Sequence, residues 1–195
     1  MQGDAGMSDT NGIVAEKAAL RQAQMEKRDA IPRPMRLLAG HAVMGEPHWS
    51  VLSAHLPKPG GVIATYVAMR SEFDPGLLVM RLVNLGYKIT CPRVTKEGLV
   101  FHQVKNAAEL EEGPFGTRQP KTSAPILKPD LFLAPLLAFD DEGYRLGYGK
   151  AYYDRAFATH PDAKRVGLAF TAQRVDRVPR ETHDVPLHAV LAVET

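Results

Sequence analysis

Residues 62–67 constrain the fold of this chain more than any other segment. This run, Val-Ile-Ala-Thr-Tyr-Val, carries no charge and follows a turn-forming stretch at residues 57–61. A strand without alternating polar residues is typical of a sheet that is covered on both faces, as parallel sheets usually are. We therefore expect a parallel sheet between layers of helices.

Helical and strand patterns alternate along the chain. Asp74-Pro75 begins an expected helix with leucines along one stripe, and Gly86 ends it. Residues 111–128, rich in Gly, Pro, Thr and Ser, indicate an irregular excursion. The other expected helices cover residues 14–30, 35–44 and 150–159. The other expected strands cover residues 87–91, 99–104, 131–134, 165–170 and 189–193.

This alternation predicts an α/β fold. We expect an open, mostly parallel sheet with helices on both faces, a Rossmann-like three-layer arrangement in a single domain. Residues 1–12 are expected to form a flexible N-terminal tail, and residues 13–195 the single domain. Ligands of such folds bind beyond the carboxyl ends of the strands.

Composition excludes several classes of protein. The 24 basic and 22 acidic residues leave a formal charge of +2, which argues against the dense basic patch of a nucleic-acid-binding protein. No apolar run approaches the roughly 18 residues that span a membrane. The only cysteine, Cys91, has no partner for a disulfide, which fits a reducing compartment. We expect a cytoplasmic monomer without nucleic-acid or membrane partners.

A glycine-rich segment precedes the expected helix at residues 150–159. Gly147 and Gly149 stand one residue apart, and Lys150 follows directly. Glycines let backbone amides approach an anion, a helix N-terminus adds partial positive charge, and a lysine adds a full one. The shape of this motif alone is equally compatible with a phosphate site and with a plain strand-to-helix turn.

The longer string around these glycines is more specific. It reads Gly143-x-Arg145-Leu146-Gly147-x-Gly149-Lys150-x-Tyr152-Tyr153-Asp154. This string resembles the signature of the 5-formyltetrahydrofolate cyclo-ligase family, also called methenyltetrahydrofolate synthetases. Further segments resemble the family in the same order, namely Lys17-x-x-Leu20-Arg21, residues 62–72, Cys91-Pro92-Arg93, residues 134–140 and His183-Asp184.

The resemblance implies an ATP-dependent closure of 5-formyltetrahydrofolate to 5,10-methenyltetrahydrofolate, with release of ADP and phosphate, through a phosphorylated formyl intermediate. It implies that Arg145 and Lys150 are catalytic, and that Asp154 and Asp184 hold Mg²⁺. The residues implied to contact ATP are Lys17, Arg21, Arg145, Leu146, Gly147, Tyr148, Gly149, Lys150, Ala151, Tyr152 and Tyr153. Those implied to contact the folate are Val67, Glu72, Tyr148, Gly149, Lys150 and Tyr152.

Two positions depart from the family pattern. Ala151 stands where the family usually has a third glycine, and a methyl group is tolerable there if φ is negative. Tyr148 occupies a position that is arginine in some relatives. Any role of a cation at that position would then pass to Arg145 or Lys150.

Each candidate also has a purely structural interpretation. Lys17, Arg21, Gln24 and Arg28 recur at helical spacing along one face, and for Lys17 and Arg21 this could simply be a solvated helix face. Asp154 would favour a helix start through the helix dipole alone. Glu72 fits a turn at a helix start, and Asp184 fits a surface loop. Of Tyr152 and Tyr153, one is expected to line the pocket and one to pack inward. His102 and His183 have no histidine or cysteine at the spacing of a zinc site.

Two other functions compete with the cyclo-ligase hypothesis. Phosphosugar isomerases and CoA-transferase-like proteins use similar open α/β folds, but the chain carries no signature that matches them. A folate- or nucleotide-binding regulator without turnover would keep the same loop, and Ala151 is the only residue in favour of it.

Overall fold

The computed structural model describes residues 5–195, with the side chains of residues 12–195 other than Phe115. Its centre is a six-stranded sheet of order β10-β9-β6-β1-β2-β3. All neighbours are parallel except β2 and β3, which are antiparallel. The strands are β1 (Val62–Ala64), β2 (Lys88–Val94), β3 (Leu99–Gln103), β6 (Leu131–Pro135), β9 (Lys164–Phe170) and β10 (Ala189–Val193).

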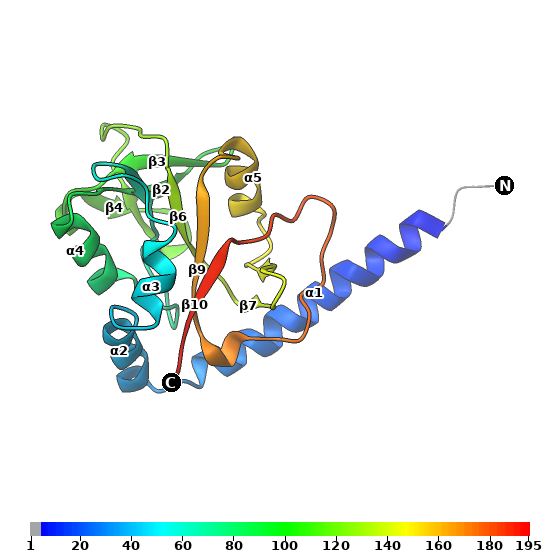
Figure 1. Ribbon diagram of the computed structural model, residues 1–195. Coiled ribbons are helices and arrows are strands. Elements are labelled where there is room, and N and C mark those ends of the chain that lie inside the picture. Colours follow the sequence, from blue (N-terminus) through cyan, green and yellow to red (C-terminus); the bar gives the residue numbers. More distant parts are fainter. Residues whose placement is uncertain (1–4) are drawn as a thin grey trace.

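Apolar side chains from successive strand residues enter two different cores. Ile63, Leu131 and Leu133 belong to the core under α2 (Arg33–Ala42), α3 (His48–Ser53) and α4 (Gly76–Asn84). Ala64 and Phe132 belong to the core under α5 (Tyr152–Thr159). Because successive strand side chains point to opposite faces, an uncharged run buries both. The predicted three-layer α/β fold is confirmed (Figure 1).

The helix α1 (Ala5–Asp29) begins earlier than the sequence predicted. Residues 5–12 were expected in the flexible tail, but their backbone is helical, whereas residues 1–4 lie outside the described part of the chain. The division into a tail and a domain at residue 13 stays a prediction. The buried side of α1 packs on η3 (Thr171–Gln173) and on β7 (Ala138–Phe139).

Two predicted elements have different bounds or structure. The strand expected over residues 62–67 ends at Ala64; Thr65 still donates to the carbonyl of Thr90 in β2, and Tyr66 and Val67 line a pocket. The excursion expected at 111–128 contains an antiparallel pair, β4 (Leu110–Glu112) and β5 (Arg118–Pro120), next to η1 (Ala107–Glu109) and η2 (Pro114–Gly116). A second small pair is formed by β7, which precedes the glycine-rich segment, and β8 (Arg145–Leu146), which lies in it.

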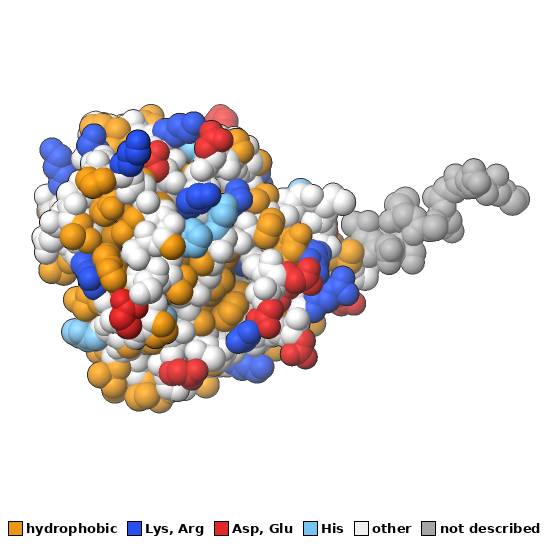
Figure 2. Space-filling view, viewed as in Figure 1, with side chains coloured by type: hydrophobic (Ala, Val, Ile, Leu, Met, Phe, Trp, Pro, Cys, Tyr) orange, Lys and Arg blue, Asp and Glu red, His pale blue; other side chains and the backbone are white. Residues whose placement is uncertain are grey.

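The surface agrees with the balanced composition. Figure 2 shows both signs of charge interspersed over the face in view. No helix among residues 5–195 is long and apolar enough to cross a membrane. The expectations of a cytoplasmic monomer without nucleic-acid or membrane partners stay predictions.

Candidate functional site

A pocket of about 460 Å³ lies beyond the carboxyl ends of β1, β2 and β6. This is the edge of a parallel sheet at which ligands of open α/β folds bind. Every residue that the sequence predicted for the site lines this pocket, although positions 17 and 184 are 167 residues apart. The fold therefore brings the predicted residues together, while their individual roles stay predictions.

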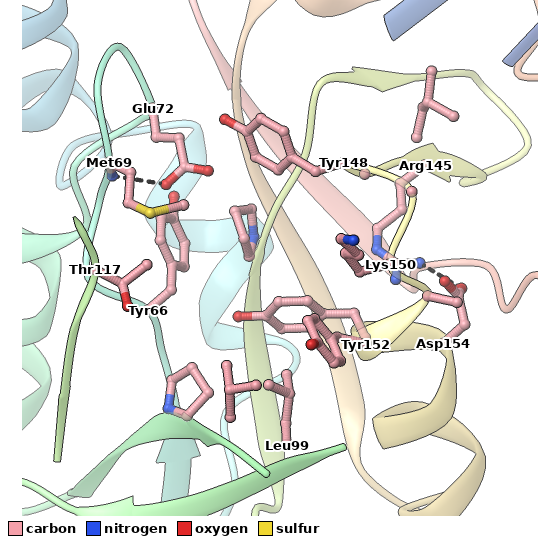
Figure 3. Close-up of a pocket in the computed structure, with 18 of the residues that line it drawn as sticks. Tyr66, Met69, Glu72, Leu99, Thr117, Arg145, Tyr148, Lys150, Tyr152 and Asp154 are labelled. Carbon is pink, nitrogen blue, oxygen red and sulfur yellow. Dashed lines mark hydrogen bonds and ion pairs between the residues drawn. The ribbon is translucent and has the colours of Figure 1, made fainter. Parts of the chain in front are cut away.

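The pocket has two chemically different ends (Figure 3). Glu72 and Tyr148 face each other at one end, and Lys150 lies at another with Arg145 and Asp154. Tyr152 lies between them. Further lining residues that sequence reasoning missed are Tyr66, Met69, Arg70, Pro92, Val94, Leu99, Pro114, Thr117, Arg118, Gln119, Pro135, Glu181 and His183.

The polar face of α1 is turned inward rather than to solvent. Lys17 is only 6% exposed, and its Nζ lies 2.7 Å from Glu181 Oε2 and 2.6 Å from Asp184 Oδ2. Arg21 donates from Nε to the carbonyl oxygen of Gly147 over 2.9 Å. The alternative of a solvated helix face is therefore wrong for Lys17. The helical spacing of these polar residues indicated that they share one face of the helix, but the sequence did not show which residues pair with them.

Two residues of the loop before α5 have left-handed backbones. Gly149 has φ of +88°, and a Cβ there would lie 3.1 Å from Cζ of Arg21, so glycine suits both the backbone and the space. Ala151, the N-cap residue of α5, has φ of 49°. Our condition of a negative φ at Ala151 is thus not met, and its methyl group is held in a strained conformation. Lys150, between them, is exposed.

Arg145 and the two tyrosines form the base of this loop. The Arg145 guanidinium lies 4.6 Å from the Phe157 ring centroid and donates to Asp154 Oδ1. Tyr153 packs edge-on against Phe157, whereas Tyr152 faces the pocket, as expected for one inward and one lining tyrosine. Tyr153 nevertheless also contributes to the pocket lining. Burial raises the pKa of Tyr153 well above its ordinary value, so its hydroxyl stays protonated.

Glu72 is a buried carboxylate at the far end. It is 7% exposed, and the backbone amide of Met69 donates to its Oε2 over 2.9 Å. Burial raises the pKa of Glu72, while the Met69 amide, the charge of Arg28 and the hydroxyl of Tyr148 lower it. The hydrogen bond from Met69 agrees with the interpretation of Glu72 as a turn residue. That interpretation does not explain why the carboxylate is buried in the wall of a pocket.

The two predicted metal ligands lie on neighbouring segments. The backbone amide of Val185, next to Asp184, donates to Asp154 Oδ1 over 3.4 Å. Asp154 lies in the first turn of α5, as its helix-dipole interpretation requires. Among the described residues no group of three or more His, Cys, Asp or Glu side chains is placed to hold a metal ion.

The fold and the pocket define an open α/β protein with a polar ligand site at the carboxyl edge of its sheet. The model of the 5-formyltetrahydrofolate cyclo-ligase family matches residues 13–193. The chain therefore belongs to this family of ligases, and the resemblance seen in the signature is confirmed.

Individual relatives agree with this assignment. The 5-formyltetrahydrofolate cyclo-ligase of Haemophilus influenzae is 31% identical over 138 residues, 66% of this chain and 74% of the relative. That of Mycolicibacterium smegmatis is 29% identical over 188 residues, 90% and 92% of the two chains. The structure of Aquifex aeolicus 5,10-methenyltetrahydrofolate synthetase has a TM-score of 0.70 at 26% identity and covers 89% of this chain and 88% of that one.

Proposed function

We propose that this protein uses ATP to close 5-formyltetrahydrofolate into 5,10-methenyltetrahydrofolate. The observation that carries the proposal is a single pocket with a glycine-rich, lysine-bearing helix start at one end and a buried carboxylate at the other. The first end suits a polyphosphate. The second suits the amino and ring N–H groups of a pterin, which donate to a carboxylate.

The proposed reaction has two steps. The formyl oxygen attacks the γ-phosphorus of ATP, an oxygen–phosphorus bond forms, and the bond to the leaving oxygen of ADP breaks. The amine nitrogen at position 10 then attacks the formyl carbon and loses its proton to solvent, and phosphate departs with the formyl oxygen. Phosphorylation is needed because an amide oxygen is a poor leaving group.

The protein would align the formyl oxygen with the γ-phosphorus of ATP and neutralise the negative charge of the phosphates. Lys150 and the free amides at the start of α5 would hold the transferring phosphoryl group, with Arg145 beside them. Lys17 and Arg21 would contact the nucleotide phosphates, and residues 145–153 would wrap the nucleotide. Glu72 would accept hydrogen bonds from the pterin, with Val67, Tyr148 and Tyr152 along the folate.

The donor set fits a magnesium ion. Asp154 Oδ2 and Asp184 Oδ1 accept no hydrogen bond from residues within the described chain. The nearest recorded cationic partner of Asp184 Oδ1 is Nε2 of His183 at 3.9 Å, outside hydrogen-bond distance. Mg²⁺ typically takes one or two carboxylates and completes its shell with phosphate oxygens and water. Asp154 and Asp184 would hold the ion, which when bound neutralises charge on the phosphates.

One assay tests the proposal. Purified protein with ATP, Mg²⁺ and 5-formyltetrahydrofolate should form methenyltetrahydrofolate, ADP and phosphate in equal amounts, and omission of any one component should stop it. With ¹⁸O in the formyl group, the label should appear in the released phosphate. Label elsewhere would exclude the phosphorylated intermediate. Binding of both substrates without product, with turnover only in Ala151→Gly, would instead support the regulator.

A further inference from the structure

Arg28 is a buried arginine that lies behind the pocket wall. It sits in α1 and is only 1% exposed, so it cannot touch a ligand in the pocket directly. Its Nη2 donates to the hydroxyl of Tyr148 over 2.6 Å, and its Nε donates to Ser71 Oγ over 3.0 Å. Ser71 in turn donates to Asp29 and directly precedes Glu72. Arg28 therefore hydrogen-bonds to both sides of the folate end of the pocket, the side of Tyr148 and the side of Glu72.

The charge of Arg28 acts on Glu72. Titratable groups near this carboxylate are Arg28 from α1, Tyr148 from the loop before α5, Tyr66 beyond β1 and Tyr153 from α5. On its own segment, Arg70 lines the same pocket, and the adjacent Ser71 donates to Asp29. Of these groups, Arg28 is the cation whose charge lowers the pKa of Glu72 against the effect of burial.

Burying an arginine in this place is energetically unfavourable without a compensating partner. Its Nη1 is buried and has no hydrogen-bond partner among the described residues, and the same holds for Oε1 of Gln24 one turn earlier. A buried, partly unsatisfied guanidinium costs free energy. The placement is accounted for by the hydrogen bonds of Arg28 to Tyr148 and to Ser71, because they tie both sides of the folate end to α1.

We infer that Arg28 is a positioning residue that holds Tyr148 and the Ser71–Glu72 segment in place on the two sides of the folate end, and thereby sets the affinity of the pocket for the folate. The inference rests on the proposed function, because it takes the folate to be the ligand of Glu72. It predicts a larger effect on folate binding than on ATP binding, because Arg28 contacts both sides of the folate end but, of the residues assigned to ATP, hydrogen-bonds Tyr148 and not Lys17, Arg21 or Lys150 in the described structure.

Calorimetry of Arg28→Met, Arg28→Lys and the wild type tests this inference. Binding of 5-formyltetrahydrofolate and of ATP is measured separately over a range of pH. Without the Arg28 charge the pKa of Glu72 rises further, so folate affinity should fall away at higher pH than in the wild type. On this acid limb we expect about tenfold weaker folate binding in Arg28→Met. ATP affinity should fall much less than folate affinity, and Arg28→Lys should restore part of the loss.

Arg81→Met is the matched control. Arg81 stacks on Trp49 with Cζ 3.4 Å from the ring centroid and donates to the carbonyl of Met44, away from the pocket. Its loss should lower thermal stability and leave the folate profile at its wild-type position.

Two outcomes would overturn the inference, and they differ from a failure of the proposed function. If Arg28→Met binds folate with the wild-type pH profile, or loses ATP and folate binding equally, Arg28 is only structural. If Arg28→Met does not fold, Arg28→Lys decides by the same measurement. If the wild type itself fails to bind 5-formyltetrahydrofolate, the proposed function is wrong and this inference falls with it.

Discussion

Arg145 donates from Nη1 to Oδ1 of Asp154 over 3.0 Å, so a cation assigned to ATP and a carboxylate assigned to Mg²⁺ neutralise each other. The Arg145 side chain is 4% exposed and that of Asp154 is 15% exposed. Removing one partner of such a pair leaves the other charge buried, which commonly costs about 3 kcal/mol. Asp154 therefore has a structural role whether or not it also holds a metal ion.

The metal assignment predicts a shift in magnesium requirement. Asp154→Asn should raise the Mg²⁺ concentration needed for activity at saturating ATP, and Asp184→Ala should raise it less. Glu181→Gln is the control, because it removes the other carboxylate partner of Lys17 without touching an assigned ligand. A magnesium titration that is identical in all four proteins, with thermal stability lowered in Asp154→Asn, would make both aspartates purely structural.

Lys150→Ala should lower turnover about a hundredfold and leave the fold intact, because the charge matters mainly as phosphate is transferred. The side chain is exposed, so little packing is lost. Turnover and thermal unfolding are compared with those of Lys58→Ala, an exposed lysine outside the pocket. Equal turnover in the two variants would argue against the phosphate loop.

Glu72→Gln should separate binding from stability. Burial raises the pKa of Glu72 above its ordinary 4.5, so the folded chain binds this proton more tightly than the unfolded chain. The resulting stability is present below pH 4.5 and is lost as pH rises through the raised pKa. The glutamine variant should thus be more stable than the wild type at neutral pH, with the difference shrinking on acidification, and should bind folate, but not ATP, more weakly.

Denaturant unfolding at several pH values measures this difference, and calorimetry measures the binding. Glu142→Gln is a control of opposite sign, because hydrogen bonding to Arg180 lowers the pKa of the exposed Glu142. A Glu72→Gln variant that is less stable than the wild type at neutral pH would show that the carboxylate stabilises the fold.

Ala151→Gly should stabilise the protein by about 1 kcal/mol, because glycine adopts a left-handed backbone without the steric cost that Ala151 bears. For a chain of this size that corresponds to a rise in melting temperature of about 2–4 °C. The same substitution at Ala54, where φ is −66°, should instead destabilise the protein by about 0.5 kcal/mol. If the two substitutions changed the stability in the same direction, the strain inferred at Ala151 would be contradicted.

The sequence by itself determined the class of fold and the position of the loop. Uncharged runs such as residues 131–134 indicate strands that are buried on both faces, because successive side chains point to opposite faces and none of them is polar. The loop at residues 143–154 is continuous, so its signature needs no knowledge of distant contacts. Both features are local, and local patterns are readable from a single sequence.

Only the tertiary structure decided which polar groups are paired. Lys17 meets Asp184, and Arg28 meets Tyr148 120 positions downstream, because the sheet order places the loop before α5 and residues 181–184 against one face of α1. Helical spacing placed these cations on a common face but could not show whether water or carboxylates cover it. Burial and ionic partners depend on the elements that pack together, and those contacts arise only when the whole sheet is assembled.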